Sequence, residues 1–492
     1  MRWHKRRMWV IPVEAGDIML LRDEHCVASG AVCRSVAKME HKTDMNNFTI
    51  ANALVVPLTE APQSFTGYVR VKDGGITEIG AGHFSEAPDG EAIDAAGCVL
   101  MPGLINAHTH LYQVLLRAVW EKLELMPWLR RIYGCASVLR PEHFYAGSLL
   151  GCIEAIRSGV TTLCEHNFLN PSPECAFETI RAIEDSGLRA VFARTIMDTG
   201  EIVPDCTKEK PEQAFRHIEN ILTKYKANGL SFMTGPNTPP INTTPQLLRE
   251  IRRFANDNSL GISAHVAESK SVVETVRREH GKNGVVEFLH EFDIPARNSI
   301  FAHSVHVSND EIRLLKETGT SVSHNPVSNM MLGDGVAPVV EMLREGVNVA
   351  LGTDGAASNH SQDLFDTMKA ASLLQKVHHQ DAGVIDPYSV LRMATIGGAK
   401  ALGLDSTCGT IEVGKRADLI LMDVDTIHNQ PINDLFSQIV HCAKASDVRT
   451  VIVNGEILMR DRTLIRHDEK KIVLDAKIAN RDLMERVNRL SF

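Results

Sequence analysis

The chain has 492 residues, a length that suits a large catalytic domain together with a smaller one. Hydrophobic residues make up 44% and charged residues 23%, so we expect a packed core rather than a disordered chain. The net charge of −9 argues against a nucleic-acid-binding surface, and no apolar run reaches the roughly 20 residues of a membrane-spanning helix. The ten cysteines form no CxxC pair, so we expect reduced thiols and a cytoplasmic protein. From the charge and the lack of a long apolar run, we expect neither a nucleic-acid partner nor a membrane partner.

Residues 1–45 show no clear hydrophobic period. Four basic residues before position 8 resemble the start of a signal peptide, but the apolar stretch Met8–Val13 is too short for one. We therefore predict a poorly ordered extension that the folded protein does not need.

Two segments far apart in the sequence carry short β-type runs. The first covers residues 46–102 and the second covers 405–492, where Asn454-Gly455 between two β runs predicts a tight hairpin. Each segment is too small to bury a core alone. We predict one small β-sandwich domain built from both ends of the chain.

The middle of the chain, 103–404, alternates strand-like and helix-like segments. An alternation of eight strand–helix units over about 300 residues is typical of an α/β fold, the (β/α)8 TIM barrel. A doubly wound open sheet is the alternative. The predicted strands are Val99–His108, Val160–His166, Arg189–Arg194, Leu230–Gly235, Gly261–Val266, Ser299–Ser304, Thr320–Asn325 and Asn348–Asp354.

The carboxyl ends of these strands, where barrel enzymes place their active sites, are rich in histidine. A single buried histidine is most often a hydrogen-bonded core residue, but histidine at five of eight strand ends favours a metal site. Both imidazoles of His108-Thr-His110 face the same side, because side chains alternate along a strand. Two such imidazoles, a third from across the barrel and one carboxylate suit Zn²⁺ or Fe²⁺. The residues at or just after the ends are His108, His110, Glu165, His166, His265, Glu268, His303, His306, His324 and Asp354.

Several motifs of the middle segment resemble the amidohydrolase superfamily. They are Pro102–His110, His265-Val-Ala-Glu268, Ser323-His-Asn-Pro326 and Leu351–Asn359, and the later stretch Gly409–Ile420 fits the same family. More narrowly, they are similar to the branch of methylthioadenosine/S-adenosylhomocysteine deaminases and s-triazine hydrolases. The resemblance runs from about residue 46 to 465.

The resemblance implies a site with one metal, Zn²⁺ or alternatively Fe²⁺, held by His108, His110, His265 and Asp354. It also implies that Glu268 is the proton shuttle and that His303 positions the attacking water. Asp354 would additionally accept a proton from that water. The predicted fourth strand lacks the lysine that bridges two metals in binuclear relatives.

The substrate is less well defined by the motifs. Nucleoside-deaminating relatives carry a Glu nine residues after a Trp and a His after the fourth strand, where this chain has Ser137 and Asn237. Those departures favour a free ring over a nucleoside. We expect Gln113, Trp128, His166, Arg194 and Asn237 to contact it.

We therefore predict an aminohydrolase, a hydrolase of C–N bonds other than peptide bonds, that releases ammonia from a purine-, pterin- or triazine-type heterocycle. The enzymatic alternatives are a methylthioadenosine/S-adenosylhomocysteine deaminase and a triazine chlorohydrolase. The non-enzymatic alternative is an amidohydrolase-like assembly protein, which would be expected to lose ligands that are all present here. A small heterocyclic molecule is the expected partner, and we expect a homo-oligomer.

Overall fold

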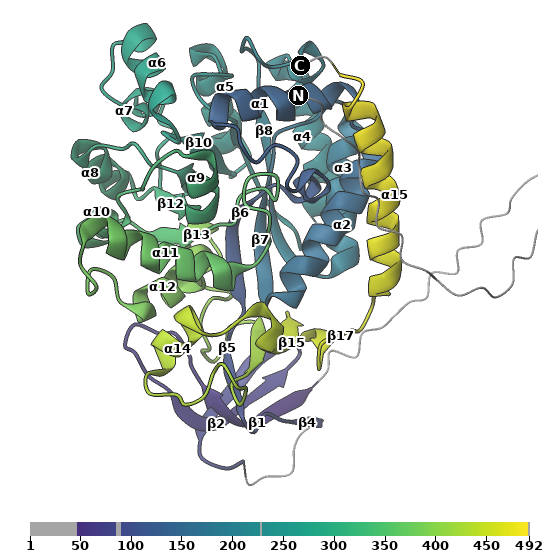
Figure 1. Cartoon of the computed structure of the whole chain (residues 1–492), viewed down its shortest axis with the longest axis vertical. Helices are drawn as coiled ribbons and strands as arrows, with labels where there is room; N and C mark the ends of the chain where they lie inside the picture. The colour runs from purple at the N-terminus through teal and green to yellow at the C-terminus, as the bar shows by residue number, and fades with distance from the viewer. Residues whose placement is uncertain (1–46, 85–89, 227–228, 491–492) are drawn as a thin grey trace, which may run out of the picture. The chain divides into compact units, whose positions relative to one another are not determined.

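The computed structural model describes residues 47–84, 90–226 and 229–490 (Figure 1). The chain divides into two units, Met1–Asp44 and Met45–Phe492, and all the described residues belong to the second unit. The predicted extension 1–45 lies outside the described residues. Within the described ranges, no helix is both long and apolar enough to cross a membrane.

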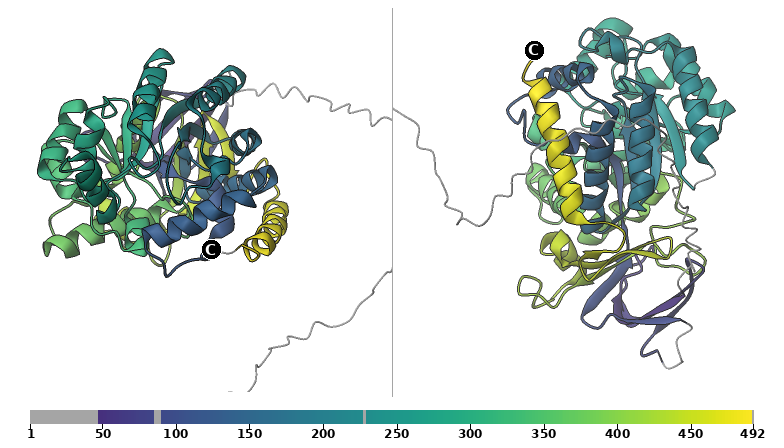
Figure 2. Two further views of the ribbon diagram at one scale, coloured as in Figure 1. Left: turned by 90° about the horizontal axis from the view of Figure 1, so that it is seen from above. Right: turned by 90° about the vertical axis from the view of Figure 1, so that its right-hand side faces the viewer.

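Eight parallel strands form the barrel that the sequence predicts. They pair in chain order from β6 to β13, and β13 also lies against β6, so the sheet nearly closes on itself (Figure 2). The strands are β6 (Leu104–Thr109), β7 (Val160–Asn167), β8 (Arg189–Ile196), β9 (Ser231–Pro236), β10 (Gly261–Val266), β11 (Ser299–His303), β12 (Ser321–His324) and β13 (Val349–Leu351).

Helices follow the strands and cover the outside of the barrel (Figure 1). In α5 (Pro245–Asp257), Thr244 caps the first turn by accepting a hydrogen bond from the Leu247 amide. Its apolar positions, three and four residues apart, are buried against the strands. The others before residue 330 are η1 (Leu111–Leu116), α1 (Leu125–Gly134), η2 (Cys135–Ser137), α2 (Pro141–Arg157), α3 (Pro173–Ser186), η3 (Asp205–Thr207), α4 (Pro211–Tyr225), α6 (Lys270–His280), α7 (Val285–His290), α8 (Asn309–Thr318) and α9 (Pro326–Leu332). The later helices are α10 (Val339–Glu345), α11 (Leu364–His379), α12 (Pro387–Met393), α13 (Ile396–Ala401), α14 (Leu435–His441), η5 (Ala445–Asp447) and α15 (Glu469–Val487).

The two β segments form one mixed sheet of nine strands with its own apolar core, as predicted for a small domain built from both chain ends. Strands β5 and β14 pair and so join the two segments. The predicted hairpin at Asn454-Gly455 connects β15 to β16, and both residues have the positive φ that this turn needs. The strands are β1 (Phe48–Val55), β2 (Phe65–Lys72), β3 (Gly75–Ala81), β4 (Glu91–Asp94), β5 (Cys98–Pro102), β14 (Leu419–Asp423), β15 (Val448–Val453), β16 (Glu456–Arg460) and β17 (Thr463–Leu464).

The predicted strand Val99–His108 is two strands in the structure. β5 belongs to the small sheet and β6 to the barrel, and Gly103 lies between them. A Cβ atom at Gly103 would lie 2.2 Å from Oγ1 of Thr161, so only glycine fits at this crossing. An apolar run continues through both strands because both are buried, which hides the break in the sequence.

Helix α15 lies along α2 of the barrel (Figure 1), although we assigned residues 405–492 to the small domain. Asn480 donates a hydrogen bond to the Leu115 carbonyl of η1, and Nε2 of His143 lies 3.0 Å from the Asp482 carboxylate. The domain boundaries remain a prediction, but the contacts of α15 are with the barrel.

Candidate metal centre

Four side chains meet at the carboxyl ends of the barrel strands. His108 and His110 lie at the end of β6, His265 lies in β10, and Asp354 follows β13. One nitrogen or oxygen atom of each lies within 4.8 Å of the corresponding atoms of the other three, and all four residues are buried. These four are the residues that the resemblance implies as metal ligands.

The hydrogen bonds of His110 and His265 fix the direction of their lone pairs. Nδ1 of His110 lies 2.7 Å from the His166 carbonyl oxygen and Nδ1 of His265 lies 3.0 Å from that of Asn237, so both Nδ1 atoms carry hydrogen. In the neutral rings, both Nε2 atoms then present lone pairs, although they lie only 3.2 Å apart. Two lone pairs at this distance repel each other unless they share a cation, so the cluster fits a metal ion.

Three separations between the ligand atoms match those expected around a bound zinc ion. Oδ1 of Asp354 lies 3.4 Å from Nε2 of His108 and 3.1 Å from Nε2 of His110. Bonds of 2.0–2.1 Å in a tetrahedron place neighbouring ligand atoms about 3.3 Å apart. Nε2 of His108 is buried and has no hydrogen-bond partner among the described residues, so it too is available as a ligand.

The remaining oxygen of Asp354 is held by two hydroxyl groups. Ser328 and Ser358 donate to Oδ2 at 2.6 and 2.9 Å. Asp354 itself has a φ of 61°, an uncommon value for a residue other than glycine. The two serines therefore fix the orientation of the carboxylate and leave Oδ1 facing the histidines.

Glu268 and His303 lie beside this cluster. Oε1 of Glu268 is 3.6 Å from Nε2 of His303, and both side chains are almost completely buried. Burial raises the pKa of Glu268 well above its usual range, and the nearby carboxylates of Asp334 and Asp354 raise it further. Glu268 is therefore suited to hold and donate a proton at neutral pH.

Asn329 determines which nitrogen of His303 carries hydrogen. Its Nδ2 lies 2.9 Å from Nδ1 of His303 and 3.5 Å from Oδ2 of Asp334, which orients the amide NH2 toward both atoms. Burial lowers the pKa of His303 to about 3, so the ring is neutral. Because Nδ1 accepts, the hydrogen of the neutral ring is on Nε2, which faces Glu268.

A small buried cavity of about 20 Å³ adjoins the cluster. This volume is roughly that needed for a single water molecule. The lining residues are His110, Gln113, Leu125, Trp128, Leu129, Phe168, Asn237, Thr238, His265, Glu268, His303 and Asp354.

Three of the five predicted substrate residues line this cavity. The Gln113 amide is fully buried and makes no hydrogen bond with a described residue, so it is free to pair with a ligand. Trp128 also lines the cavity, and its ring N–H has no hydrogen-bond partner in the described part of the chain. Asn237 is different, because Nδ2 donates to the Tyr133 hydroxyl and Oδ1 lies 3.2 Å from Nε2 of His166. Its side chain is fully engaged within the protein.

His166 and Arg194 do not line the cavity. The His166 ring lies between Ser263 and Asn237, with one nitrogen against each side chain. Arg194 is 2% exposed and its guanidinium forms an ion pair with Glu209 at 2.7 Å. The predicted contacts of these two residues with the substrate find no counterpart in the geometry.

Sequence reasoning missed several residues that shape the site. Asn329 and Ser328 lie on the short helix α9, and Phe168 lies just after β7. Their places directly after barrel strands are the only signal of a role that the sequence carries. Which atom each contacts depends on pairs far apart in the chain, such as Asn329 with His303.

Comparison with known proteins assigns the family. The model of the amidohydrolase family matches residues 99–458, most of the chain. The chain belongs to the amidohydrolase family. The predicted recognition is thereby confirmed, and so is the prediction of a hydrolase that acts on C–N bonds.

Curated relatives and solved structures agree with this family. The chain is 37% identical over 444 residues to a 5-methylthioadenosine/S-adenosylhomocysteine deaminase of Syntrophomonas wolfei, covering 88% of this chain and 98% of the relative. It is 38% identical over 450 residues to a 5'-deoxyadenosine deaminase of Methanosarcina mazei, covering 90% and 100%. Among solved structures, an adenosine deaminase from Xanthomonas campestris with bound zinc has a TM-score of 0.83 at 29% identity, covering 90% and 99%.

Proposed function

We propose that this amidohydrolase is a metal-dependent deaminase that removes the exocyclic amino group of a nitrogen heterocycle and releases ammonia. The observation that carries the proposal is that Glu268 and His303 line one cavity with His110, His265 and Asp354 of the four-residue cluster. Family membership and the deaminase names of the relatives support the same reaction class.

We propose that His108, His110, His265 and Asp354 hold one metal ion, Zn²⁺ first and Fe²⁺ as the alternative. The opposed lone pairs of His110 and His265 support a cation at this point. Such an ion activates a water molecule at neutral pH by lowering its pKa. Three nitrogen ligands and one oxygen ligand suit either metal.

The protein's own residues supply the proton transfers in this proposal. Asp354 accepts one proton as the water oxygen bonds to the ring carbon that bears the amine. Glu268, protonated because of its raised pKa, donates its proton to the adjacent ring nitrogen. The C–N bond then breaks, and the proton held by Asp354 leaves with the amine as ammonia. The hydroxyl proton on the same carbon passes to Glu268 as the C=O bond forms, so Glu268 is protonated again for the next turnover.

His303 is proposed to stabilise charge rather than to accept a proton. Its Nε2–H faces the cavity because Nδ1 accepts from Asn329. A hydrogen-bond donor at this point stabilises the oxygen that becomes negative as the tetrahedral carbon forms.

Gln113 supports recognition of the ring. Its amide offers one acceptor and two donor hydrogens in a buried cavity where no described residue satisfies them. A Cβ atom at Gly355 would lie 1.8 Å from Oε1 of Gln113, so the loop after β13 also confines this amide. An amidine or amide edge of a heterocycle matches such a pair of groups.

The names of the relatives favour a second candidate, a 5'-modified adenosine, over a free ring. The residues favour the free ring. Ser137 donates to the Gly134 carbonyl on the exposed side of η2, and the Asn237 amide is fully engaged. Neither residue supplies a charged hydrogen-bond partner for the ribose hydroxyls. Each hydrogen bond to such a charged group would contribute roughly 1.5–3 kcal/mol to binding.

Ammonia release from a panel of substrates tests the function. Zinc-loaded protein is assayed with purine bases, a pterin, an aminotriazine, methylthioadenosine and S-adenosylhomocysteine, with His265→Ala as the metal-free control. We expect ammonia release, with kcat/KM for a free ring at least equal to that for the nucleosides. A nucleoside preference of 100-fold, about 2.7 kcal/mol, would establish the second candidate instead. Chloride release from a chlorotriazine without ammonia release from any amine would contradict deamination.

Two further proposals concern the setting of the enzyme. The described cysteines are all free thiols, which supports a reducing, cytoplasmic location. Leu474 and Ile478 of α15 are 56% and 57% exposed, which supports a homo-oligomer that covers this face. Analytical ultracentrifugation of the wild type and the Leu474→Glu/Ile478→Glu variant tests the second proposal. We expect an oligomeric wild type and a dissociated variant, and a monomeric wild type would contradict the proposal.

A further inference from the structure

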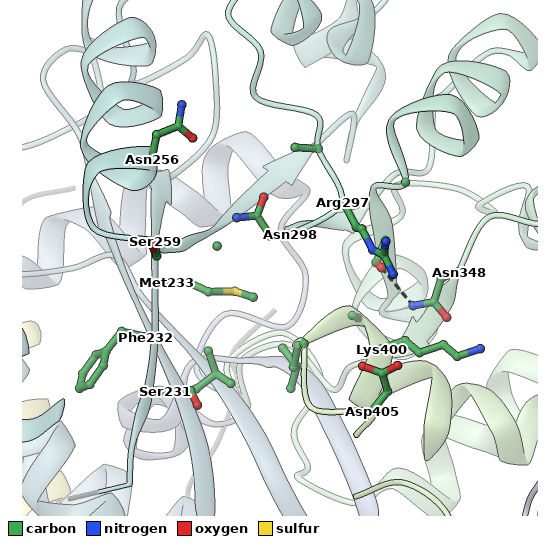
Figure 3. Close-up of a pocket in the computed structure, with 18 of the residues that line it drawn as sticks. Ser231, Phe232, Met233, Asn256, Ser259, Arg297, Asn298, Asn348, Lys400 and Asp405 are labelled. Carbon is green, nitrogen blue, oxygen red and sulfur yellow. Dashed lines mark hydrogen bonds between the residues drawn. The ribbon is translucent and has the colours of Figure 1, made fainter. Parts of the chain in front are cut away.

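A second cavity, of about 870 Å³, lies at the opposite end of the barrel from the metal centre (Figure 3). Ser231, Gly261 and Ser321, which are the first residues of β9, β10 and β12, line it. The metal-cluster residues lie at the other ends of the barrel strands. The volume falls in the range of roughly 300–1,000 Å³ that small-molecule sites occupy.

The lining of this cavity is positively charged in a negatively charged protein. Arg252, Arg297 and Lys400 face one carboxylate, Asp405, so three positive charges against one negative charge leave +2, whereas the chain carries −9. Within the part of the chain that the structure describes, no carboxylate lies within 4.0 Å of the Arg297 or Lys400 side-chain nitrogens. Both residues are exposed at the rim of the cavity, where they can meet an anion.

Arg252 contributes a more deeply placed cation. Its guanidinium donates to the Ile294 carbonyl and to Oδ1 of Asn256, and its Nε is buried with no hydrogen-bond partner among the described residues. These bonds to neutral groups hold the guanidinium in place, and the nearby carboxylate of Asp293 offsets part of its charge. Arginine and lysine together are a common set of donors to phosphate.

The inner wall of the cavity is apolar. Val191, Met233 and Leu402 are buried there, and Met233 and Phe232 project from opposite sides of β9 (Figure 3). At the rim, the amide NH2 of Asn298 donates to the Leu260 carbonyl. The apolar wall suits the face of a planar heterocycle, and the cations suit a phosphate.

We propose that this cavity binds a phosphorylated purine nucleoside, with the phosphate on Arg297 and Lys400 and the base against Met233 and Leu402. The site is separate from the metal centre, and the proposal does not depend on the deaminase activity. It therefore stands or fails independently of the reaction proposed above.

Calorimetric titration of the zinc-loaded protein tests the proposal. Inosine monophosphate and inosine are the probes, because neither carries an amino group that the proposed reaction could remove. The test variant is Arg297→Gln/Lys400→Gln, and the matched control is Arg253→Gln/Arg344→Gln, which removes two exposed positive charges outside the cavity.

We expect the monophosphate to bind at least 10-fold more tightly than inosine, and more weakly as salt rises. The test variant should lose at least 10-fold in affinity for the monophosphate, while the control variant keeps wild-type affinity. Both variants should retain wild-type turnover and thermal midpoint, which shows that they fold. Equal binding of the two probes, or wild-type affinity of the test variant, would overturn the proposal.

Discussion

At the residue scale, Glu268 and His265 lie three positions apart but are proposed to do different work. Glu268→Gln keeps the size and burial of the side chain and removes only its titratable proton. We expect kcat to fall by about 10²–10⁴ with metal content unchanged. His265→Ala should lose metal and activity together. Elemental analysis and steady-state kinetics on both variants measure this, and near-normal turnover of Glu268→Gln would contradict the proton-shuttle role.

A second prediction at this scale concerns Asn329 and the tautomer of His303. In Asn329→Asp the carboxylate accepts from Nδ1–H, so the hydrogen moves away from Nε2 and the donor facing the cavity is lost. We expect kcat to fall about 10²-fold with little change in KM. Nitrogen chemical shifts of the His303 ring report the tautomer directly. Asn329→Ala is the control, because it removes the hydrogen-bond partner of Nδ1 without replacing a donor by an acceptor. An unchanged tautomer in Asn329→Asp would refute the positioning role.

At the element scale, α15 is stabilised by its contact with the barrel. Leu483 is 0% exposed and belongs to the same apolar cluster as Phe144 of α2 and Trp128 of α1. Leu483→Ala should lower the free energy of unfolding by about 2–5 kcal/mol, since it leaves a cavity in that cluster. Lys477→Ala, at an exposed position on the same helix, should change it by less than about 0.5 kcal/mol. Urea unfolding of both variants measures the difference, and equal effects would contradict the packing of α15 on the barrel.

Also at this scale, the start of α11 carries a pH-dependent contribution. Burial, together with the neighbouring carboxylate of Asp366, raises the pKa of Asp363 to about 6. Because the folded pKa exceeds the unfolded value of 3.8, the native state binds the proton more tightly and this residue costs stability as pH rises from about 4 to 6. Asp363→Asn keeps a capping side chain, so its gain in unfolding free energy should grow over that interval, to at most about 3 kcal/mol at pH 7. Urea titrations at pH 4 and pH 7 measure it, and an equal effect at both would contradict the raised pKa.

At the scale of the whole molecule, residues 1–44 show no hydrophobic period in the sequence and precede the first strand predicted for the small domain. We therefore expect the chain lacking residues 1–44 to keep wild-type kcat and a thermal midpoint within about 1 °C of the full chain. Differential scanning calorimetry and the ammonia assay compare the two chains. A large loss of either quantity would show that the extension contributes to the folded protein.

The location of the functional side chains was predictable from the sequence, because a barrel places the carboxyl ends of all its strands at one face. His108, His110, His265 and Asp354 come from strands far apart in the chain, yet the (β/α)8 arrangement alone brings them together. The break at Gly103 was not predictable, since two buried strands in succession give one continuous apolar run.

The sequence by itself determined the strand–helix alternation and the strand ends rich in histidine and carboxylate, because these depend on local period. The resemblance to a family then singled out the four-residue cluster, Glu268 and His303 among those strand-end residues. Only the tertiary structure decided what each polar group faces. It directs Arg194 to Glu209 and engages Asn237 with Tyr133, whereas it leaves Gln113 free beside the cluster. The physical reason is that a hydrogen bond is set by distances of about 3 Å between residues that are tens or hundreds of positions apart, and no local pattern encodes that distance.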